Sequence, residues 1–306
     1  MAFHVPDKST NLFDEVVPRF RVLLKQRVIT GIDETRFEQW LGNFESEEEC
    51  YFAACLLNRL VFRSSAMIES SFDQLLHCII PSFLRKKGLF PYQDIDSFLN
   101  ELRTPNFDCP IRFIGVDGDR PTDTGKSGPM IIRMFKQRAK INNSLTLRAD
   151  SLKNLPDVVK CLIFLDDTLG TGKQFSKFAK LHSLAENKTQ LLFCPLVAYT
   201  DGIQKLRDEH DSLVTLPVET LDSRHRFFSE SSKKPGFWNV DESNTVEDAR
   251  EFSRSLAEKH GIPTPSFCLD LLLGFEGATP NNTLSILWAD PALRGTPSVW
   301  MPLLVR

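Results

Sequence analysis

The amino-acid sequence predicts an α/β protein with a mostly parallel sheet flanked by helices and with an N-terminal helical region. Three apolar runs of strand length, residues 111–116, 161–165 and 191–199, each end in polar residues that include glycine, and helical patterns lie between them. This order of strand, loop and helix is typical of parallel sheets with right-handed crossovers. The first hundred residues instead carry apolar side chains at helical spacing.

Residues 1–104 are expected to form the helical region, and residues 105–306 an α/β domain with a C-terminal extension. The sequence predicts helices over residues 33–41, from Ser46 onward, over about 65–80 and over 92–102. Ser46 with Glu49 has the pattern of a capping box, and Pro81 is expected to end the third helix. These apolar stripes indicate core packing rather than a cofactor site.

A polar segment, residues 117–128, follows the first predicted strand of the α/β domain. It ends in Lys126, Ser127 and Gly128, and Pro129 is expected at the first position of the next helix. The length and polarity of the segment are compatible with an active-site loop and equally with a solvated surface loop.

Two adjacent carboxylates, Asp166 and Asp167, follow the apolar run 161–165. Ligands of open α/β sheets bind beyond the carboxyl ends of such strands. Carboxylates there suit ribose hydroxyls or a divalent cation, because hard cations prefer oxygen ligands. Acids after a strand also serve as plain caps and turn formers, which is the simpler interpretation of the pair.

The residues after the acids predict an anion-binding loop. Gly170 and Gly172 permit backbone angles at which successive N–H groups converge on one point. Thr168 and Thr171 add hydroxyl donors to this loop, and Lys173 adds a positive charge at the N-terminus of the predicted helix. Together these groups suit a phosphate. The P-loop of nucleoside triphosphatases is excluded, because the required first glycine and the Ser or Thr after Lys173 are both missing.

The later chain predicts short strands over residues 144–147, 212–218 and 284–288. A helix is expected from about residue 244 to residue 260, with Gly261 in the C′ position. Trp288 and Trp300 are expected in the core rather than against a ligand.

The composition excludes several classes of function. Net charge is −3 and the pI is about 6.1, so nucleic-acid binding is not indicated. Seven cysteines without zinc-finger spacing suggest buried thiols in a reducing cytosol. Residues 1–10 lack an apolar signal region, and no apolar run is long enough to span a membrane. We therefore expect a cytoplasmic protein.

The strand, the two acids and the Thr/Gly loop resemble the phosphoribosyl-pyrophosphate (PRPP) binding loop of type I phosphoribosyltransferases, and thus imply a type I phosphoribosyltransferase-like fold. The resemblance implies that Asp166 and Asp167 hold the ribose hydroxyls, with Mg²⁺ nearby, and that the loop Thr168–Lys173 holds the 5′-phosphate. It further implies a pyrophosphate loop formed by Arg120, Lys126, Ser127 and Gly128, in which Asp117, Asp119 or Asp123 binds a metal or serves as a base. The sequence departs from the family at Lys173 and Gln174, and its loop lacks an acid.

A narrower resemblance rests on the blocks 40–44, 279–288 and 300–306 together with the Asp-Asp-x-x-Gly-x-Gly-Lys loop. With these blocks the chain resembles the phosphoribosyltransferase-like family of bacterial conflict and anti-phage operons, the PRTase-CE type. This implies an anti-phage effector that binds PRPP or a nucleotide with Mg²⁺ and transfers or hydrolyses at the ribose C1. A protein partner from the same operon is expected, and oligomerisation stays open. The alternatives are an inactive PRPP or nucleotide sensor that regulates a partner through the helical region, and a scaffold with a vestigial loop.

Overall fold

The computed structural model describes residues 3–6, 10–116, 127–230, 236–263, 269–291 and 300–306. The chain forms two compact units. One, here called the terminal unit, consists of Met1–Ala66 with Asp222–Arg306, and the other, here called the sheet unit, is Met67–Leu221. The expected division after residue 104 stays a prediction. The predicted fold class is confirmed: mostly parallel strands flanked by helices, with a helical N-terminal region.

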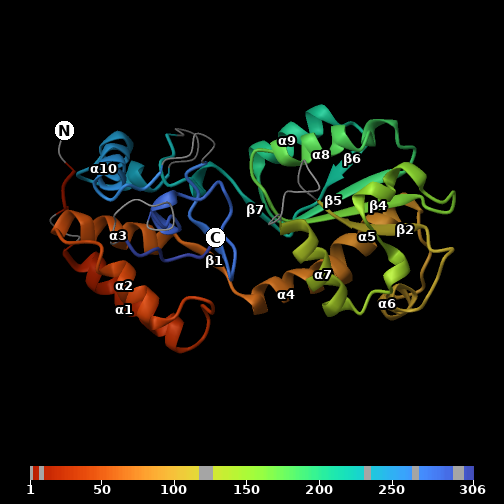
Figure 1. Ribbon diagram of the computed structural model, residues 1–306, viewed down its shortest axis with the longest axis horizontal. Helices are drawn as coiled ribbons and strands as arrows, with labels where there is room; N and C mark the ends of the chain where they lie inside the picture. The colour runs from red at the N-terminus through yellow and green to blue at the C-terminus, as the bar shows by residue number, and fades with distance from the viewer. Residues whose placement is uncertain (1–2, 7–9, 117–126, 231–235, 264–268, 292–299) are drawn as a thin grey trace. The chain divides into compact units, whose positions relative to one another are not determined.

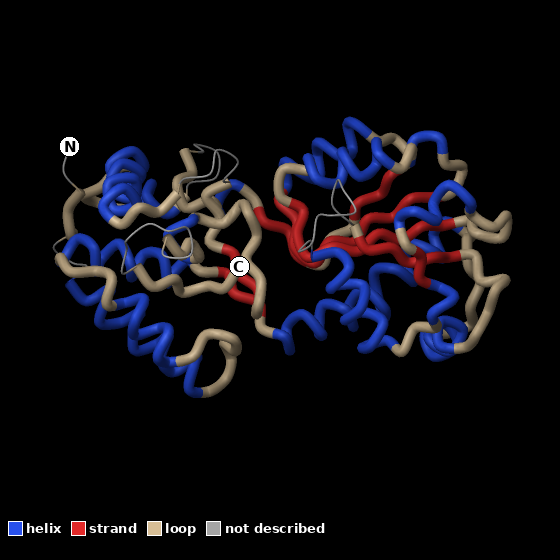
Figure 2. Tube along the Cα trace, in the orientation of Figure 1, coloured by secondary structure: helices blue, strands red, loops and turns tan. Residues whose placement is uncertain are grey.

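The sheet unit is built on a parallel sheet with the strand order β3-β2-β4-β5-β6 (Figures 1 and 2). Its strands are β2 (Ile111–Gly115), β3 (Thr146–Leu147), β4 (Cys161–Leu169), β5 (Gln190–Tyr199), β6 (Leu213–Thr215) and β7 (Glu219–Leu221). β6 and β7 both pair with the free edge of β5, one after the other. β4 and β5 are the longest strands, and nearly all of their residues are buried, as expected for strands covered on both faces.

Helices cover both faces of this sheet (Figure 1). They are α5 (Ile80–Lys87), α6 (Ile95–Arg103), α7 (Ser127–Ala139), α8 (Lys173–Leu181) and α9 (Thr200–Glu209). α8 and α9 pack on the face that carries Leu162 and Phe164 of β4. On the other face, Phe135 of α7 contacts Phe113 of β2, with ring centroids 5.3 Å apart. Alternate residues of each strand therefore serve two separate cores.

The predicted end of the third helix at Pro81 is wrong. α4 (Ser65–Gln74) continues through a π-helical turn, Leu75–Ile79, directly into α5. Pro81 lies in the first turn of α5, where its missing N–H breaks no regular helical bond, because the preceding turn is wider. The Ile80 N–H instead donates to the Leu75 carbonyl.

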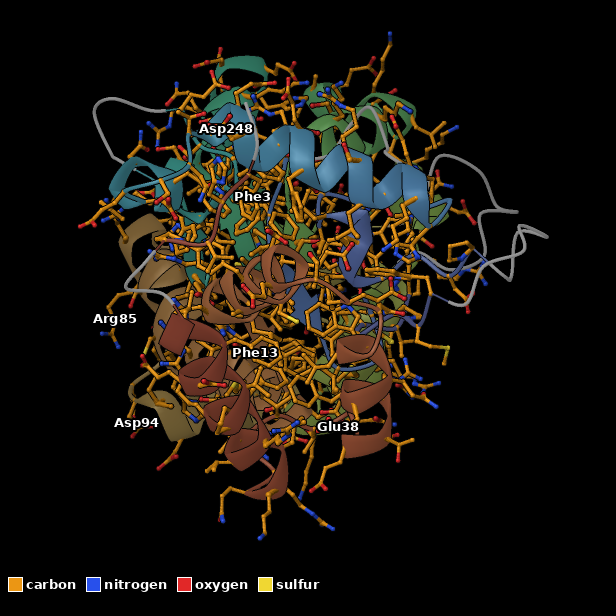
Figure 3. All side chains as sticks on the ribbon, turned by 90° about the vertical axis from the view of Figure 1, so that its left-hand side faces the viewer. Phe3, Phe13, Glu38, Arg85, Asp94 and Asp248 are labelled. Atoms are coloured by element: carbon orange, nitrogen blue, oxygen red, sulfur yellow. The ribbon has the colours of Figure 1, made fainter. Side chains whose placement is uncertain are left out.

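The terminal unit packs helices around an aromatic core. Its elements are α1 (Thr10–Lys25), α2 (Glu34–Leu41), α3 (Glu47–Arg59), α10 (Val246–Lys259) and the parallel pair β1 (Val61–Arg63) and β8 (Leu273–Phe275). Phe3 lies beneath α10 (Figure 3) and stacks on Phe252 with ring centroids 4.4 Å apart. Trp288 and Trp300 are buried in this core, as predicted.

Other predicted elements differ in detail. Residues 284–288 form no strand; a 3₁₀ turn, Ser285–Leu287, stands there, with the Trp288 N–H bonded to the Ser285 carbonyl. The expected strand 212–218 is replaced by two short strands, β6 and β7. The capping boundary at Ser46 is confirmed, and Gly261 has the positive φ of a C′ glycine. Among the described residues, no helix is long and apolar enough to cross a bilayer.

Candidate functional site

The candidate site lies where the sheet reverses its strand order. From β2 the chain moves outward to the edge strand β3 and then returns to β4 on the opposite side of β2. Such a reversal leaves a crevice at the carboxyl ends of the two strands, which is the usual ligand position of open α/β sheets. β2 ends at Gly115, and the neighbouring end of β4 carries Asp166 and Asp167.

The two acids lie inside β4, not beyond it as the sequence suggested. β4 continues to Leu169 because β5 extends alongside it, with Asp166 opposite Pro195 and Thr168 opposite Val197. Only 2% of Asp166 and 8% of Asp167 are exposed to solvent. The sheet therefore fixes both carboxylates in a nearly dry environment, where electrostatic interactions are strong.

Ser127, the first residue of α7, joins the two carboxylates. Its Oγ lies 2.8 Å from Oδ1 of Asp166 and 2.7 Å from Oδ1 of Asp167. The contact connects the segment after β2 to the end of β4 across the switch point. The structure thus brings one residue of the predicted pyrophosphate loop, Ser127, together with the predicted ribose-binding acids.

The protonation of this trio follows from its geometry. Burial, and then the nearby charge of Asp167, raise the pKa of Asp166 well above its ordinary value, and the Ser127 hydroxyl opposes part of this rise. Ser127 has one hydroxyl proton and cannot donate to both carboxylates at once. A protonated Asp166 that donates to Ser127, which in turn donates to Asp167, satisfies all three oxygens.

Two further side chains complete the surroundings of the acids. Gln174 Nε2 lies 3.3 Å from Oδ2 of Asp166, and the N–H and hydroxyl of Thr168 donate to Oδ1 of Asp167. Thr168 was expected in the phosphate loop, but its hydroxyl is directed to Asp167. In the part of the chain that the structure describes, no Lys or Arg pairs with either acid.

The expected anion loop is short, and its backbone donors have no partner among the described residues. It comprises Gly170, Thr171 and Gly172, and α8 begins at Lys173. Gly172 adopts the left-handed conformation, with φ of 77°, and no side chain caps the helix. Within the described residues, the backbone N–H groups of residues 170–175 have no hydrogen-bond partner. Six consecutive free donors at a helix N-terminus favour an anion.

Gly202, in the first turn of α9, holds the loop in place. A Cβ at this position would lie 2.1 Å from the Gly170 carbonyl oxygen, which is far inside van der Waals contact. The absence of a side chain therefore allows α9 to press against the loop. Gly128 has a similar packing role, because a Cβ there would lie 2.1 Å from the Val116 carbonyl oxygen.

The remaining predicted site residues are placed as follows. Lys173 is exposed at the start of α8, and none of the described carboxylates pairs with it. Arg120 and Lys126, expected in the pyrophosphate loop, lie outside the described residues, as do Asp117, Asp119 and Asp123. The structure therefore brings together the acids, the anion loop and Ser127.

The acids fit a divalent cation. The two carboxylates converge on one hydroxyl, and no Lys or Arg among the described residues forms an ion pair with them. They offer the hard oxygen ligands that Mg²⁺ prefers. The described part of the chain holds no group of three or more His, Cys, Asp or Glu residues with metal-binding geometry. Mg²⁺ commonly binds one or two carboxylates and completes its shell with water and substrate phosphates, so this pair is sufficient.

Sequence reasoning missed two residues of this site. Gln174 was noted only as a departure from a family pattern, and its contact with Asp166 depends on the first turn of α8 folding back toward the strand. Gly202 was not among the predicted site residues, and the structure shows that it allows close packing against the loop. A Gly in the first turn after a strand is the only sequence signal for such an approach.

Comparisons with known proteins place the chain in a family. A crystal structure of orotate phosphoribosyltransferase from Aeropyrum pernix is similar at 18% identity, with a match that covers 42% of this chain and 72% of that chain and a TM-score of 0.27. No curated protein matches the chain. The family model PRTase-CE matches residues 37–306. Because this match spans most of the sequence, the chain belongs to the PRTase-CE family.

Proposed function

We propose that the sheet unit binds PRPP or a related nucleotide at the carboxyl edge of β2 and β4, and that it transfers or hydrolyses at the ribose C1. The observation that carries this proposal is the adjacency of two unlike groups. The buried acids Asp166 and Asp167 lie near the end of β4, and the six backbone N–H groups of residues 170–175, which have no partner among the described residues, follow them in the chain. A ligand with vicinal hydroxyls and a phosphate matches both.

Each group has a distinct role in this proposal. The carboxylates accept hydrogen bonds from the ribose 2′- and 3′-hydroxyls, which orients the sugar ring. The N–H groups of residues 170–175 and the ammonium of Lys173 bind the 5′-phosphate. Ligand held at both ends presents C1 in a fixed position, which lowers the entropic part of the barrier to attack.

Asp166 and Asp167 are the residues that would hold Mg²⁺, whose charge, when it is bound, stabilises the negative charge that develops on pyrophosphate. Ser127 keeps both carboxylates turned toward one point, so their oxygens need little rearrangement. In the reaction the bond between C1 and the pyrophosphate oxygen breaks, and pyrophosphate leaves with the electron pair. The acceptor, or water with loss of a proton, forms the new bond to C1.

A sensor without turnover is the second candidate, and two observations favour it. The loop from Thr168 to Gly172 contains no acid that could act as a base. One carboxylate oxygen of Asp166 already faces the amide of Gln174. In either form, the anti-phage setting and an operon-encoded protein partner belong to the proposal and rest on the family resemblance.

Thermal unfolding with and without ligand tests binding. We expect PRPP with Mg²⁺ to raise the melting temperature of the wild type, because a ligand that binds only the folded state stabilises it, by about 2.7 kcal/mol at a hundred times its Kd. The ligand-induced rise is expected to vanish in Asp166→Asn and Asp167→Asn. Asp150→Asn, an exposed carboxylate away from the site, is the matched control and keeps the rise. No rise with PRPP, ATP or pyrophosphate in the wild type would overturn the proposal.

Release of pyrophosphate from PRPP separates the two candidates. Turnover that is lost in Asp167→Asn and kept in Asp150→Asn supports the enzyme. A protein that is stabilised by PRPP but releases no pyrophosphate, alone or with nucleobases as acceptors, is a sensor.

A further inference from the structure

The terminal unit contains a cavity that the proposed function does not use. Its volume is about 410 Å³, and the described residues that line it belong to α2 and to the C-terminal segment, residues 288–290 and 301–306. This volume lies in the range of about 300–1,000 Å³ that is common for small-molecule sites. The walls combine apolar groups, Trp288, Pro302 and Leu304, with two basic groups, Arg36 and Arg306, and the neutral amide of Gln39.

Arg306 is held in a fixed orientation. Its guanidinium carbon lies 4.0 Å from the centre of the Trp288 ring, and its Nη2 donates to Oδ1 of Asn281. The indole is itself fixed, because its N–H donates to the Thr283 carbonyl at 3.0 Å. A guanidinium stacked in this way is a preorganised planar cation, on which a second planar ring can stack.

Arg36 adds a second guanidinium from the opposite element. Among the described residues no carboxylate pairs with its side chain, and Glu38, an acid of the same helix (Figure 3), is bound by Arg21 at 2.7 Å. Asp290 also lines the cavity, so two positive groups face one negative group. Among the described lining residues, basic side chains therefore outnumber acidic ones beside the apolar groups.

We propose that this cavity is a binding site for a small organic anion with a planar ring, of which a nucleoside monophosphate is the representative. The ring stacks on the Arg306 guanidinium, above Trp288. The anionic group pairs with Arg36, and the Gln39 amide contributes a hydrogen bond. Guanidinium groups suit this role because their fork of donors matches phosphate oxygens. The site lies in the other unit from the PRPP site and does not depend on it.

Tryptophan fluorescence provides the test, because all four tryptophans lie in the terminal unit. The full chain is titrated with AMP, GMP, CMP and UMP, and with ribose 5-phosphate, which has the sugar and the phosphate but no planar base. We expect a saturable change with at least one nucleotide and none with ribose 5-phosphate. The change is expected to disappear in Trp288→Phe and to persist in Gly202→Ala, whose altered loop affects only the PRPP site.

Arginine variants identify the site. Arg36→Gln and Arg306→Gln are each expected to lower the affinity for the nucleotide by about tenfold or more. The first removes the charge-assisted contact to the anionic group, and the second removes the planar cation on which the ring stacks. Arg254→Gln, which removes an exposed arginine of α10 outside the cavity, is the matched control and leaves the affinity within about twofold. The proposal is overturned if no nucleotide gives a saturable change, or if the change survives in both Arg36→Gln and Arg306→Gln.

Discussion

Ser127 Oγ lies 2.7 Å from Oδ1 of Asp167, and this contact ties the first turn of α7 to the end of β4. The same hydroxyl lies 2.8 Å from Asp166, so one side chain sets the position of both acids. The two elements that the contact joins flank the switch point of the sheet. The site therefore depends on a residue that lies 39 positions before the acids.

Ser127→Ala is expected to destabilise the protein. The substitution removes the hydroxyl that lies within hydrogen-bond distance of two buried carboxylates, and we expect the free energy of unfolding to fall by about 1–3 kcal/mol. Urea denaturation at neutral pH measures the change. Ser71→Ala is the matched control, because that hydroxyl donates to the Met67 carbonyl within its own helix, and its loss is expected to change stability by less than about 1 kcal/mol. Equal losses in the two variants would contradict a special role for Ser127.

Asp166→Asn is expected to stabilise the ligand-free protein at neutral pH. Folding raises the pKa of Asp166, so between the ordinary value of about 3.9 and the raised value the folded state binds more protons than the unfolded state. Wild-type stability therefore falls as the pH rises through this window, while Asn is always neutral. The Asn oxygen keeps the contacts made by Oδ1, and the Gln174 amide can turn over to accept from the new NH₂.

Denaturation of wild type and Asp166→Asn at several pH values measures this difference. The stability of Asp166→Asn relative to the wild type is expected to grow from pH 4 toward pH 8. Asp150→Asn, at an exposed position, should show no such trend. A difference that is constant with pH, or that favours the wild type at pH 8, would contradict the prediction.

The sheet was predictable because its signals are local. The apolar runs 161–165 in β4 and 191–199 in β5 are continuous, and that of β2 is interrupted by Arg112; such runs are characteristic of strands that are buried on both faces. The extension of β4 to Leu169 was not predictable, since it depends on pairing with β5 rather than on the polar residues of β4 itself. The passage of the helix through Pro81 has the same kind of cause, because the π-helical turn before it is set by packing.

The candidate site could be predicted in its residue types but not in its contacts. Two acids and a Gly-rich loop stand together in the sequence, so Asp166, Asp167 and the loop were identifiable. The contact of Ser127 with the acids depends on the strand order, which places β2 beside β4. The contact of Gly202 with the loop depends on α9 crossing beside α8, and sequence spacing does not encode such an approach.

Gly202→Ala is expected to disturb the anion loop. The added Cβ would lie 2.1 Å from the Gly170 carbonyl oxygen, so the backbone must shift, and we expect a loss of about 2 kcal/mol or more in the free energy of unfolding. Affinity for PRPP is expected to fall as well, because the free N–H groups lose their common direction. Gly42→Ala is the control, since its φ is −65° and its nearest neighbour would lie 3.4 Å away. Retained affinity in Gly202→Ala would show that this loop does not bind the ligand.

Lys173→Gln is expected to weaken phosphate binding without affecting folding. Lys173 is exposed at the first position of α8, beside the free N–H groups, and its ammonium adds a full charge to the positive end of the helix dipole. We expect affinity for PRPP and pyrophosphate to fall by about three- to tenfold at low salt, with a smaller loss at high salt because mobile ions screen exposed charges. The free energy of unfolding should change by less than about 0.5 kcal/mol. Lys180→Gln changes an exposed lysine near the far end of the same helix and should leave affinity unaltered. Equal losses in the two variants would mean that general surface charge, and not the loop, attracts the phosphate.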